Sequence, residues 1–295
     1  MSVPAASVIV RAMNKEREIE RALSALRAQT VPVEIIVVDS GSTDQTVEVA
    51  RRYCDRLIEI APEDFTYGHA LNLGAAAAAA PIHFALSAHC HPARSDWVER
   101  SLAHYERSDV AGTAGYGRVG PAEPSEGTVF QDLALLEADP FQGLSSHASS
   151  WRGELWERFP FHEEMESAED REWSWRVLKE GWVIAMDPQL GIATRHRTAE
   201  GPRHWYRISR RDVRAVATFM PLPPYTPRDA VSEWLDISHL KRRFGLRARA
   251  SPWRALSLLA KYHGIQDGAR VRRGEQPPWS PPPARQGPAP SSPGS

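Results

Sequence analysis

The chain has 295 residues, of which 42% are hydrophobic and 25% charged, so it is long and apolar enough for a globular core. Its two cysteines, Cys54 and Cys90, are too few for a disulfide framework, and no apolar run approaches the ~18 residues of a membrane span. The net charge of −1 gives no sign of a nucleic-acid partner, and the N-terminus has no secretion signal. We therefore expect a soluble, cytoplasmic protein in a reducing compartment.

Apolar runs and helical repeats alternate through the first 115 residues. We expect strands at residues 7–10, 33–38, 57–60, 83–87 and 110–114, with helices after Asn14 and Asp44 and at 70–80 and 96–106. Asn14 is expected to cap the first helix. This alternation is typical of a parallel, doubly wound sheet, so the predicted fold class is α/β. The first strand-to-helix turn matches neither GxGxxG nor GxxxxGK[ST], which argues against a standard dinucleotide or P-loop site.

The second half of the chain is less regular. Residues 122–150 are predicted to be irregular and 151–159 helical, a helix capped by Ser167 is expected to end at Gly181, and short strands are expected at 183–186 and 191–194. Beyond Gly201 the pattern is helical and basic, and after Gly274 it is rich in Pro, Ser and Gly. We therefore divide the chain into a main domain (1–200), a helical C-terminal extension (201–273) and a disordered tail (274–295).

The helical extension carries 16 Lys and Arg against 5 Asp and Glu, with Trp205, Tyr206 and Trp234 among them. Basic side chains interleaved with aromatic ones can bind phosphate, an anionic membrane surface or RNA. A solvated face that balances the acidic N-terminal part explains it as well, and we favour that interpretation.

Polar side chains gather where the strand at 83–87 ends. The residues at this point are Ser87, His89, Cys90 and His91. Their place is notable because ligands of open α/β sheets lie beyond the carboxyl ends of the strands. His89 and His91 point the same way on an extended segment. A structural zinc site needs four ligands at recognisable spacing, however, and no second pair stands nearby, so we disfavour zinc.

Two groups of carboxylates admit either a functional or a structural interpretation. Asp39 follows the second strand, where an acid can accept hydrogen bonds from a nucleobase or ribose, or can simply cap the next helix. Glu169 and Asp170 open a helix inside an acidic stretch, and they fit either a general base or a solvated helix start. His196 is a lone imidazole whose simplest interpretation is a surface residue.

Taken in order, several segments resemble bacterial family-two glycosyltransferases of the GT-A fold, in particular the rhamnosyltransferase-like branch. The resemblance covers roughly residues 7–198 and rests on order and spacing rather than on one motif. The segments are Ser7–Asn14 (SVIVRAMN), Glu34–Thr46 (EIIVVDSGSTDQT), Phe65–Gly74 (FTYGHALNLG), Leu86–Pro92 (LSAHCHP), Pro160–Glu164 (PFHEE), Ala168–Trp173 (AEDREW) and His196.

The resemblance implies a Rossmann-like, mostly parallel sheet that binds a nucleoside-diphosphate sugar across its first strands. It implies that Asp170, paired with Glu169, takes the proton from an acceptor hydroxyl in an inverting transfer. Asp39 would hold the base, and Asn72 would lie near the diphosphate. The residues that it assigns to nucleotide-sugar binding are Arg11, Ala12, Asn14, Asp39, Ser40, Asn72, Ser87, Ala88 and His89.

Two segments depart from the family pattern where the family holds its metal. Ser87-Ala88-His89 stands in place of Asp-x-Asp, and Thr194-Arg195-His196 in place of His-x-His. The resemblance thus leaves His89 and His196 as ligands of a divalent ion, Mn²⁺ or Mg²⁺, and imidazole suits Mn²⁺ better. Our hypothesis is that Arg195 and Arg197 take over part of the metal's role in neutralising the diphosphate.

The predicted function is an inverting glycosyltransferase that uses a UDP-, dTDP- or GDP-sugar. The alternative is a catalytically degenerate homologue that binds the nucleotide and serves as a scaffold or regulator. A nucleotidyltransferase is disfavoured because no Gly-rich, Lys-containing loop follows the first strand. The predicted acceptor is a small molecule, a glycan or a lipid-linked molecule. We expect no nucleic-acid partner, and we assign any peripheral membrane contact or homodimer contact to the C-terminal helices.

Overall fold

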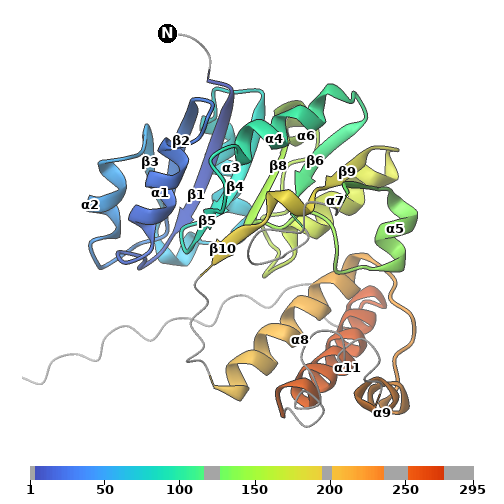
Figure 1. The fold of residues 1–295 in the computed structure, drawn as a ribbon. Coiled ribbons are helices and arrows are strands. Elements are labelled where there is room, and N and C mark those ends of the chain that lie inside the picture. Colours follow the sequence, from blue (N-terminus) through green and yellow to red (C-terminus); the bar gives the residue numbers. More distant parts are fainter. Residues whose placement is uncertain (1–3, 116–126, 195–200, 236–251, 276–295) are drawn as a thin grey trace, which may run out of the picture.

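The computed structural model describes residues 4–115, 127–194, 201–235 and 252–275. In this part of the chain a central sheet lies between two helical layers, and a group of C-terminal helices packs below it (Figure 1). The predicted disordered tail lies outside the described residues, except for Gly274 and Glu275.

An eight-stranded mixed sheet forms the centre, in the order β3-β2-β1-β4-β8-β6-β9-β7. β3, β2, β1 and β4 are parallel, whereas β8 is antiparallel to β4 and β6, and β7 is antiparallel to β9. The predicted α/β fold with helices on both faces of the sheet is confirmed. The strands are β1 (Ala6–Ala12), β2 (Val33–Asp39), β3 (Arg56–Glu59), β4 (Ile82–Ser87), β6 (Val110–Ala114), β7 (Val129–Gln131), β8 (Ala148–Arg152) and β9 (Val183–Met186), with β5 (Cys90–Pro92) and β10 (Ile192–Thr194) pairing in a separate antiparallel ribbon.

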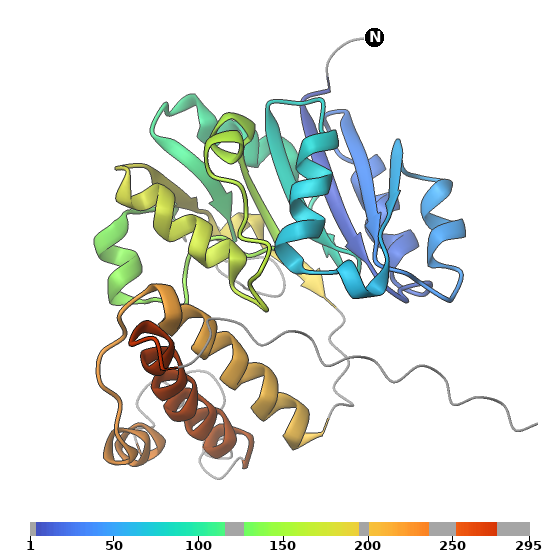
Figure 2. The ribbon, with the colours of Figure 1, turned by 180° about the vertical axis from the view of Figure 1, so that it is seen from behind.

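The strands β1, β2 and β4 occupy the centre because they are mostly apolar and buried along their whole length, as strands covered on both faces must be. Successive side chains along each strand point to opposite faces of the sheet. Val8 and Val10 pack in one core, whereas Ile9 packs in the other. Figures 1 and 2 show the helices that lie on the two faces of the sheet. The first core is covered by α1 (Ile19–Arg27), α2 (Thr46–Arg51) and α4 (Trp97–Ala103), and the second by α3 (Tyr67–Ala77), α5 (Leu133–Ala138), α6 (Gly153–Arg158) and α7 (Glu169–Lys179).

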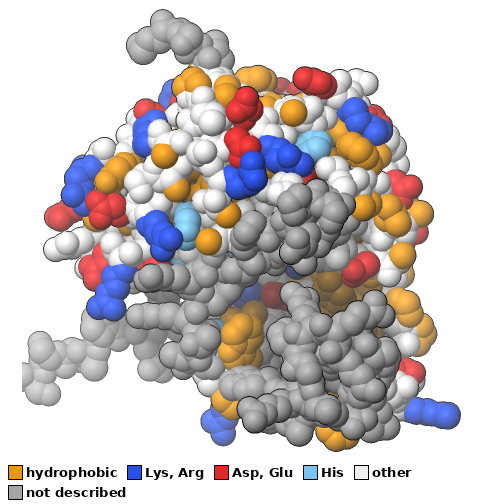
Figure 3. All heavy atoms as spheres, viewed as in Figure 1, with side chains coloured by type: hydrophobic (Ala, Val, Ile, Leu, Met, Phe, Trp, Pro, Cys, Tyr) orange, Lys and Arg blue, Asp and Glu red, His pale blue; other side chains and the backbone are white. Residues whose placement is uncertain are grey.

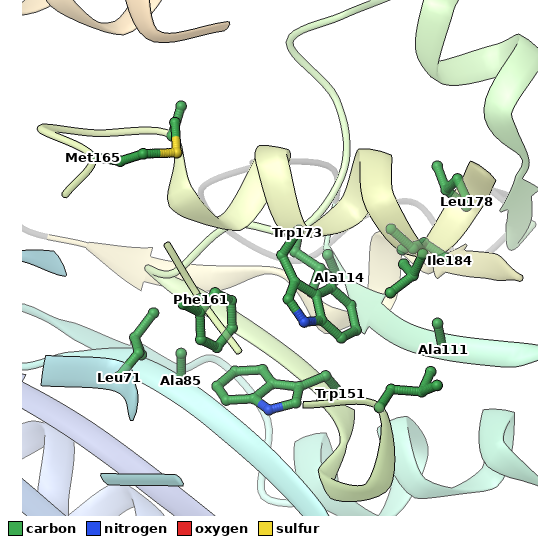
Figure 4. Packing of buried hydrophobic residues seen from close by; sticks show 14 of the residues in the cluster. Leu71, Ala85, Ala111, Ala114, Trp151, Phe161, Met165, Trp173, Leu178 and Ile184 are labelled. Carbon is green, nitrogen blue, oxygen red and sulfur yellow. The ribbon is translucent and has the colours of Figure 1, made fainter. Parts of the chain in front are cut away.

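Aromatic rings fill the layer between the sheet and α7. Trp151 of β8 meets Phe161 edge to face with ring centroids 5.0 Å apart, and Phe161 continues to Trp173 of α7 at 6.0 Å (Figure 4). The indole of Trp173 also donates a hydrogen bond to the backbone oxygen of Phe159 at 2.7 Å. This packing holds the first turn of α7 firmly against the sheet.

The C-terminal helices pack on one another and on the main domain. Gly264 allows α8 and α11 to approach closely, because a Cβ at that position would lie 2.7 Å from Cβ of Val213. Phe219 of α8 packs on Trp175 of α7 with ring centroids 5.7 Å apart. Within the described ranges, no helix is both long and apolar enough to cross a lipid bilayer. The helices are α8 (Pro202–Phe219), α9 (Pro227–Leu235) and α11 (Pro252–Arg272).

Several local predictions are wrong at segment ends. Asn14 does not cap a helix, because α1 begins at Ile19 and Asn14 has a left-handed backbone with φ of 51°. Ser167 does not cap α7 either: the residue before the helix is Ala168, which makes no side-chain cap bond. The alanine-rich helix ends at Ala77, since Ala78 is extended.

The region predicted to be irregular is instead ordered in its described part. Residues 127–150 contribute β7, α5 and most of β8, and Trp151 belongs to β8 rather than to a helix. β8 was missed because its sequence, ASSWR, has no apolar alternation. It extends the sheet because Ser150 is tied to Ser101 and Thr113 by buried hydroxyl hydrogen bonds of 2.9 and 2.8 Å.

Candidate active site

The carboxyl ends of β1 and β4 and the start of α7 converge on one cavity. Arg11 and Ser87 lie opposite each other in the register of β1 and β4, and Glu169 and Asp170 are the first two residues of α7. The cavity measures about 430 Å³. It is lined by Arg11, Lys15, Glu18, Tyr67, Ser87, His89, Ser145, Ser146, His147, Ser167, Ala168, Glu169, Asp170, Arg171, Trp205, Ile208, Arg211 and Asp212.

Arg11 is a nearly buried charge at this edge, with 8% of its surface exposed. Its Nη2 donates to the backbone oxygen of Ser146 at 2.8 Å, and its Nη1 lies 3.7 Å from Oε1 of Glu169. Nη1 and Nε make no hydrogen bond with the described residues. Because an unmet buried donor is costly, these N–H groups are suited to a polar or anionic ligand in the cavity.

Backbone geometry places the acid pair. Ala168 adopts the left-handed conformation (φ 63°, ψ 22°), which is unfavourable for a residue with a Cβ, and it turns the chain into α7. Asp170 then accepts hydrogen bonds from the backbone N–H groups of Ser146 at 2.7 Å and Arg171 at 2.8 Å, one on each carboxylate oxygen. Each oxygen keeps a lone pair, so Asp170 can still accept a proton or a hydrogen bond from a ligand.

Glu169 lies in a different electrostatic environment from Asp170. Burial raises the pKa of Glu169 to about 7, the charge of Asp170 adds to that rise, and Arg11 opposes it. Its Oε1 makes no hydrogen bond within the described residues. A carboxyl group whose pKa is raised toward neutrality by burial is a common feature of sites that carry out acid–base chemistry.

The segment Ser87-Ala88-His89 is held by its backbone. Ser87 donates its N–H to the backbone oxygen of His147 at 3.0 Å, and Ala88 donates to that of Arg11 at 3.1 Å. The rings of His89 and His147 meet edge to face with centroids 5.5 Å apart. The neighbour of His89 in the cavity is therefore His147, whereas Ala88 is fully buried and does not line the cavity.

The donors in the described residues do not by themselves form a complete divalent-ion site. In the part of the chain that the structure describes, no group of three or more His, Cys, Asp or Glu side chains is arranged to hold a metal. Ser87, His89 and His147 offer a hydroxyl and imidazoles, which suit Mg²⁺ less well than carboxylates do. His196, Arg195 and Arg197 lie outside the described residues.

The turn after β2 is tied to the turn after β1 rather than to the cavity. Asp39 is 1% exposed, and its Oδ2 accepts from the N–H groups of Gly41 at 3.0 Å and Ser42 at 2.8 Å. Ser40 donates from Oγ to the backbone oxygen of Ala12 at 3.1 Å, and Asn14 accepts from the N–H of Thr43 at 2.9 Å. Ala12, Asn14, Asp39 and Ser40 thus belong to two hydrogen-bonded turns and do not line the cavity, and their contact with a nucleotide stays a prediction.

Asn72 is placed differently from the prediction. Its Oδ1 accepts from Trp156 Nε1 at 2.9 Å and Phe161 N at 3.0 Å, and its Nδ2 donates to Phe161 O at 2.9 Å and Glu163 Oε1 at 2.8 Å. These four bonds use its amide fully, and it does not line the cavity. We therefore correct its assignment from diphosphate ligand to a clamp between α3 and residues 156–163.

Sequence reasoning missed several lining residues. Ser146 contributes through its backbone, which no side-chain pattern can reveal. Tyr67 lies between two guanidinium groups, with its ring centroid 5.1 Å from Cζ of Arg11 and 5.9 Å from Cζ of Arg211. Trp205 and Arg211 were noted only as part of a basic span, although both belong to α8 and line the cavity. Figure 3 shows charged side chains of both signs scattered over the upper part of the molecule.

Replacing Asn72 by alanine tests its corrected role. Asn72→Ala leaves the indole N–H of Trp156 and the backbone N–H of Phe161 without their acceptor, so the free energy of unfolding should fall by about 2 kcal/mol. The dissociation constant for UDP or GDP, measured by calorimetry below the melting temperature, should stay within about twofold. Normal stability with lost nucleotide binding would restore the original assignment.

The raised pKa of Glu169 predicts a pH-dependent stability. The pKa of about 7 in the folded protein exceeds the ordinary glutamate value of 4.5. The stability contributed by the protonated group is therefore complete below pH 4.5 and is lost as the pH rises through about 7. Urea unfolding from pH 4.5 to 8 should therefore show Glu169→Gln gaining stability relative to the unsubstituted protein as pH rises. Glu180→Gln, at the exposed far end of the same helix, is the control and should show no such gain. If the free energies of unfolding of Glu169→Gln and the unsubstituted protein change in parallel with pH, the raised pKa of Glu169 is contradicted.

Comparison with known proteins places this geometry in context. Residues 7–142 match the family described as "Glycosyl transferase family 2". The glycosyltransferase AglE of Haloferax volcanii is 28% identical over 260 residues, which cover 76% of this chain and 84% of that protein. The 4,4'-diaponeurosporenoate glycosyltransferase of Staphylococcus aureus is 39% identical over 56 residues, and the aligned part spans only 15% of that protein and 19% of this chain.

Solved structures share the fold at low identity. The mannosyltransferase PcManGT from Pyrobaculum calidifontis, solved with GDP-Man and Mn²⁺, gives a TM-score of 0.63 at 18% identity, covering 93% of this chain and 88% of that one. TarS residues 1–349 from S. aureus, solved with UDP, give 0.52 at 18% identity, covering 92% of both chains. Residues 7–142 are thus similar in sequence to family 2 glycosyltransferases, and the chain shares its fold with solved glycosyltransferases.

Proposed function

We propose that this protein transfers a sugar from a nucleoside-diphosphate sugar to an acceptor hydroxyl with inversion, and that Asp170 is the general base. The observation that carries the proposal is the placement of Asp170. Its carboxylate lines the cavity, two backbone N–H groups orient it, and burial raises the pKa of the neighbouring Glu169. The solved structures of similar fold with GDP-Man, UDP or UDP-GlcNAc support a nucleotide-sugar donor, with UDP, dTDP and GDP as the candidates.

In the proposed reaction, the acceptor oxygen attacks the anomeric carbon while its proton passes to a carboxylate oxygen of Asp170. The bond between that carbon and the phosphate oxygen breaks on the opposite face, and the leaving diphosphate takes the electron pair. The sugar passes through an oxocarbenium-like transition state. Ser146 and Arg171, through their N–H groups, hold Asp170 in the orientation that this transfer requires.

The leaving diphosphate gains negative charge and needs compensating cations. Four cationic side chains line the cavity, namely Arg11, Lys15, Arg171 and Arg211. Arg11 is the best placed of these, because it is held rigidly and keeps donors unused by the described residues. We propose that these side chains neutralise the diphosphate, a role that extends the hypothesis made for Arg195 and Arg197.

Asp170→Asn tests the general base. The amide keeps the size of the side chain but cannot take a proton, so kcat should fall by about 10²–10⁴-fold while the dissociation constant for the nucleoside diphosphate changes little. Glu180→Gln at the other end of α7 should leave kcat unchanged. Unaltered transfer by Asp170→Asn would exclude it as the base. Nucleotide binding without transfer by the unsubstituted protein, with any acceptor tried, would favour the non-catalytic homologue.

Metal removal tests the cationic diphosphate site. The dissociation constant for UDP or GDP should change by less than about threefold between EDTA-treated protein and protein with added Mn²⁺, because fixed side chains supply the positive charge. Arg11→Met, which keeps the stem and removes the charge, should weaken binding in both conditions. Binding that is lost in EDTA and restored by Mn²⁺ would contradict the proposal.

A further inference from the structure

One wall of the cavity comes from a C-terminal helix. α8 crosses below the carboxyl ends of the central strands (Figure 1), and Trp205, Ile208, Arg211 and Asp212 of this helix line the cavity. The first three are spaced three residues apart, so they lie on one face of the helix. The chain thus closes the cavity from below with a single helical face, which we call the α8 wall (Trp205, Ile208, Arg211 and Asp212).

Trp205 is the unusual member of the α8 wall. Tryptophans 97, 151 and 173 are at most 2% exposed, whereas Trp205 is 41% exposed and presents its indole at the cavity. A large aromatic side chain left open in a cavity is suited to stacking on a ligand.

Charged groups surround this aromatic surface. Arg211 donates from Nη2 to Asp212 at 2.9 Å and lies over the ring of Tyr67, so both its position and its charge are set before any ligand binds. Asp212 and Glu18 provide carboxylate oxygens on the same cavity. An open aromatic face bordered by hydrogen-bonding groups matches a molecule with one apolar face and polar edges.

We propose that the α8 wall is the acceptor subsite and that the acceptor is a carbohydrate whose pyranose ring stacks on Trp205. The C–H face of a pyranose is apolar and its hydroxyls project around the rim, so the ring complements an indole with carboxylates beside it. A lipid chain fits less well, because only Tyr67, Ala168, Trp205 and Ile208 among the lining residues are apolar. This inference rests on the proposed function, because the stacked ring presents its hydroxyl to Asp170.

The test compares Trp205 with a matched tryptophan. Trp234 on α9 is also 41% exposed and does not line the cavity, so Trp234→Ala controls for loss of a surface indole. Saturation-transfer NMR with methyl pyranosides of glucose, galactose, mannose, rhamnose and N-acetylglucosamine measures binding without turnover. At least one pyranoside should bind, and Trp205→Ala should weaken it about tenfold or more, with Trp205→Phe weakened less and Trp234→Ala unchanged.

Three results would overturn the acceptor subsite. The first is that the unsubstituted protein binds no pyranoside, and the second is that Trp205→Ala binds the pyranoside as tightly as the unsubstituted protein does. The third is that Trp205→Ala binds UDP or GDP more weakly than the unsubstituted protein, which would assign the indole to the nucleobase. Saturable binding of a polyprenyl phosphate in detergent that Trp205→Ala abolishes, with no pyranoside bound, would make the occupant a lipid instead.

Failure of the proposed function gives a different pattern. In that case no nucleoside diphosphate binds and no sugar is transferred, whatever the pyranosides do. Asp170→Asn separates the two further, since it should abolish transfer and leave pyranoside binding within about twofold.

Discussion

The buried guanidinium of Arg11 is the contact that holds the catalytic edge together. A charge removed from water costs several kcal/mol unless it is paired, and Arg11 meets a backbone oxygen of Ser146 and the carboxylate of Glu169. These partners lie 135 and 158 positions further along the chain, so one side chain joins the end of β1, the segment before β8 and the start of α7. Arg11 also lines the cavity, so the residue that joins these three segments borders the proposed ligand site as well.

The acid pair depends on a second constraint, which is conformational. Ala168 occupies a backbone region that costs a non-glycine residue roughly 1–2 kcal/mol. The aromatic packing of Trp151, Phe161 and Trp173 supplies the stability that keeps α7 in place despite that cost (Figure 4). The strain thus lies next to the proposed base, where a relaxed turn would shift Glu169 and Asp170 relative to Ser146.

The sequence predicted well those parts of the fold that its apolar pattern encodes. β1, β2 and β4 are continuous apolar runs, and their carboxyl ends correctly located Arg11, Ser87 and the cavity. β8 was not predicted because serines and a tryptophan form it. It is held by backbone pairing with β4 and β6 and by hydroxyl hydrogen bonds from Ser150 to Thr113 of β6 and Ser101 of α4.

The errors in the site have a common physical cause. Asn72 follows a motif that suggested a ligand, but its amide is used up by partners 84–91 positions away, which pattern reasoning does not reveal. Ser146 acts through its backbone, and Trp205 reaches the cavity only because α8 folds back under the sheet. Long-range contacts of this kind become visible only once the chain is folded.

The ring of Tyr67 has a further consequence for how the two substrates communicate. Its faces are shared by Arg11, on the side of the proposed diphosphate, and Arg211, on the α8 wall. A ligand that draws either guanidinium away from the ring changes the environment of the other. Coupling through this ring is reciprocal by thermodynamic necessity, so a ligand in either half of the cavity would alter the affinity of a ligand in the other half by the same factor.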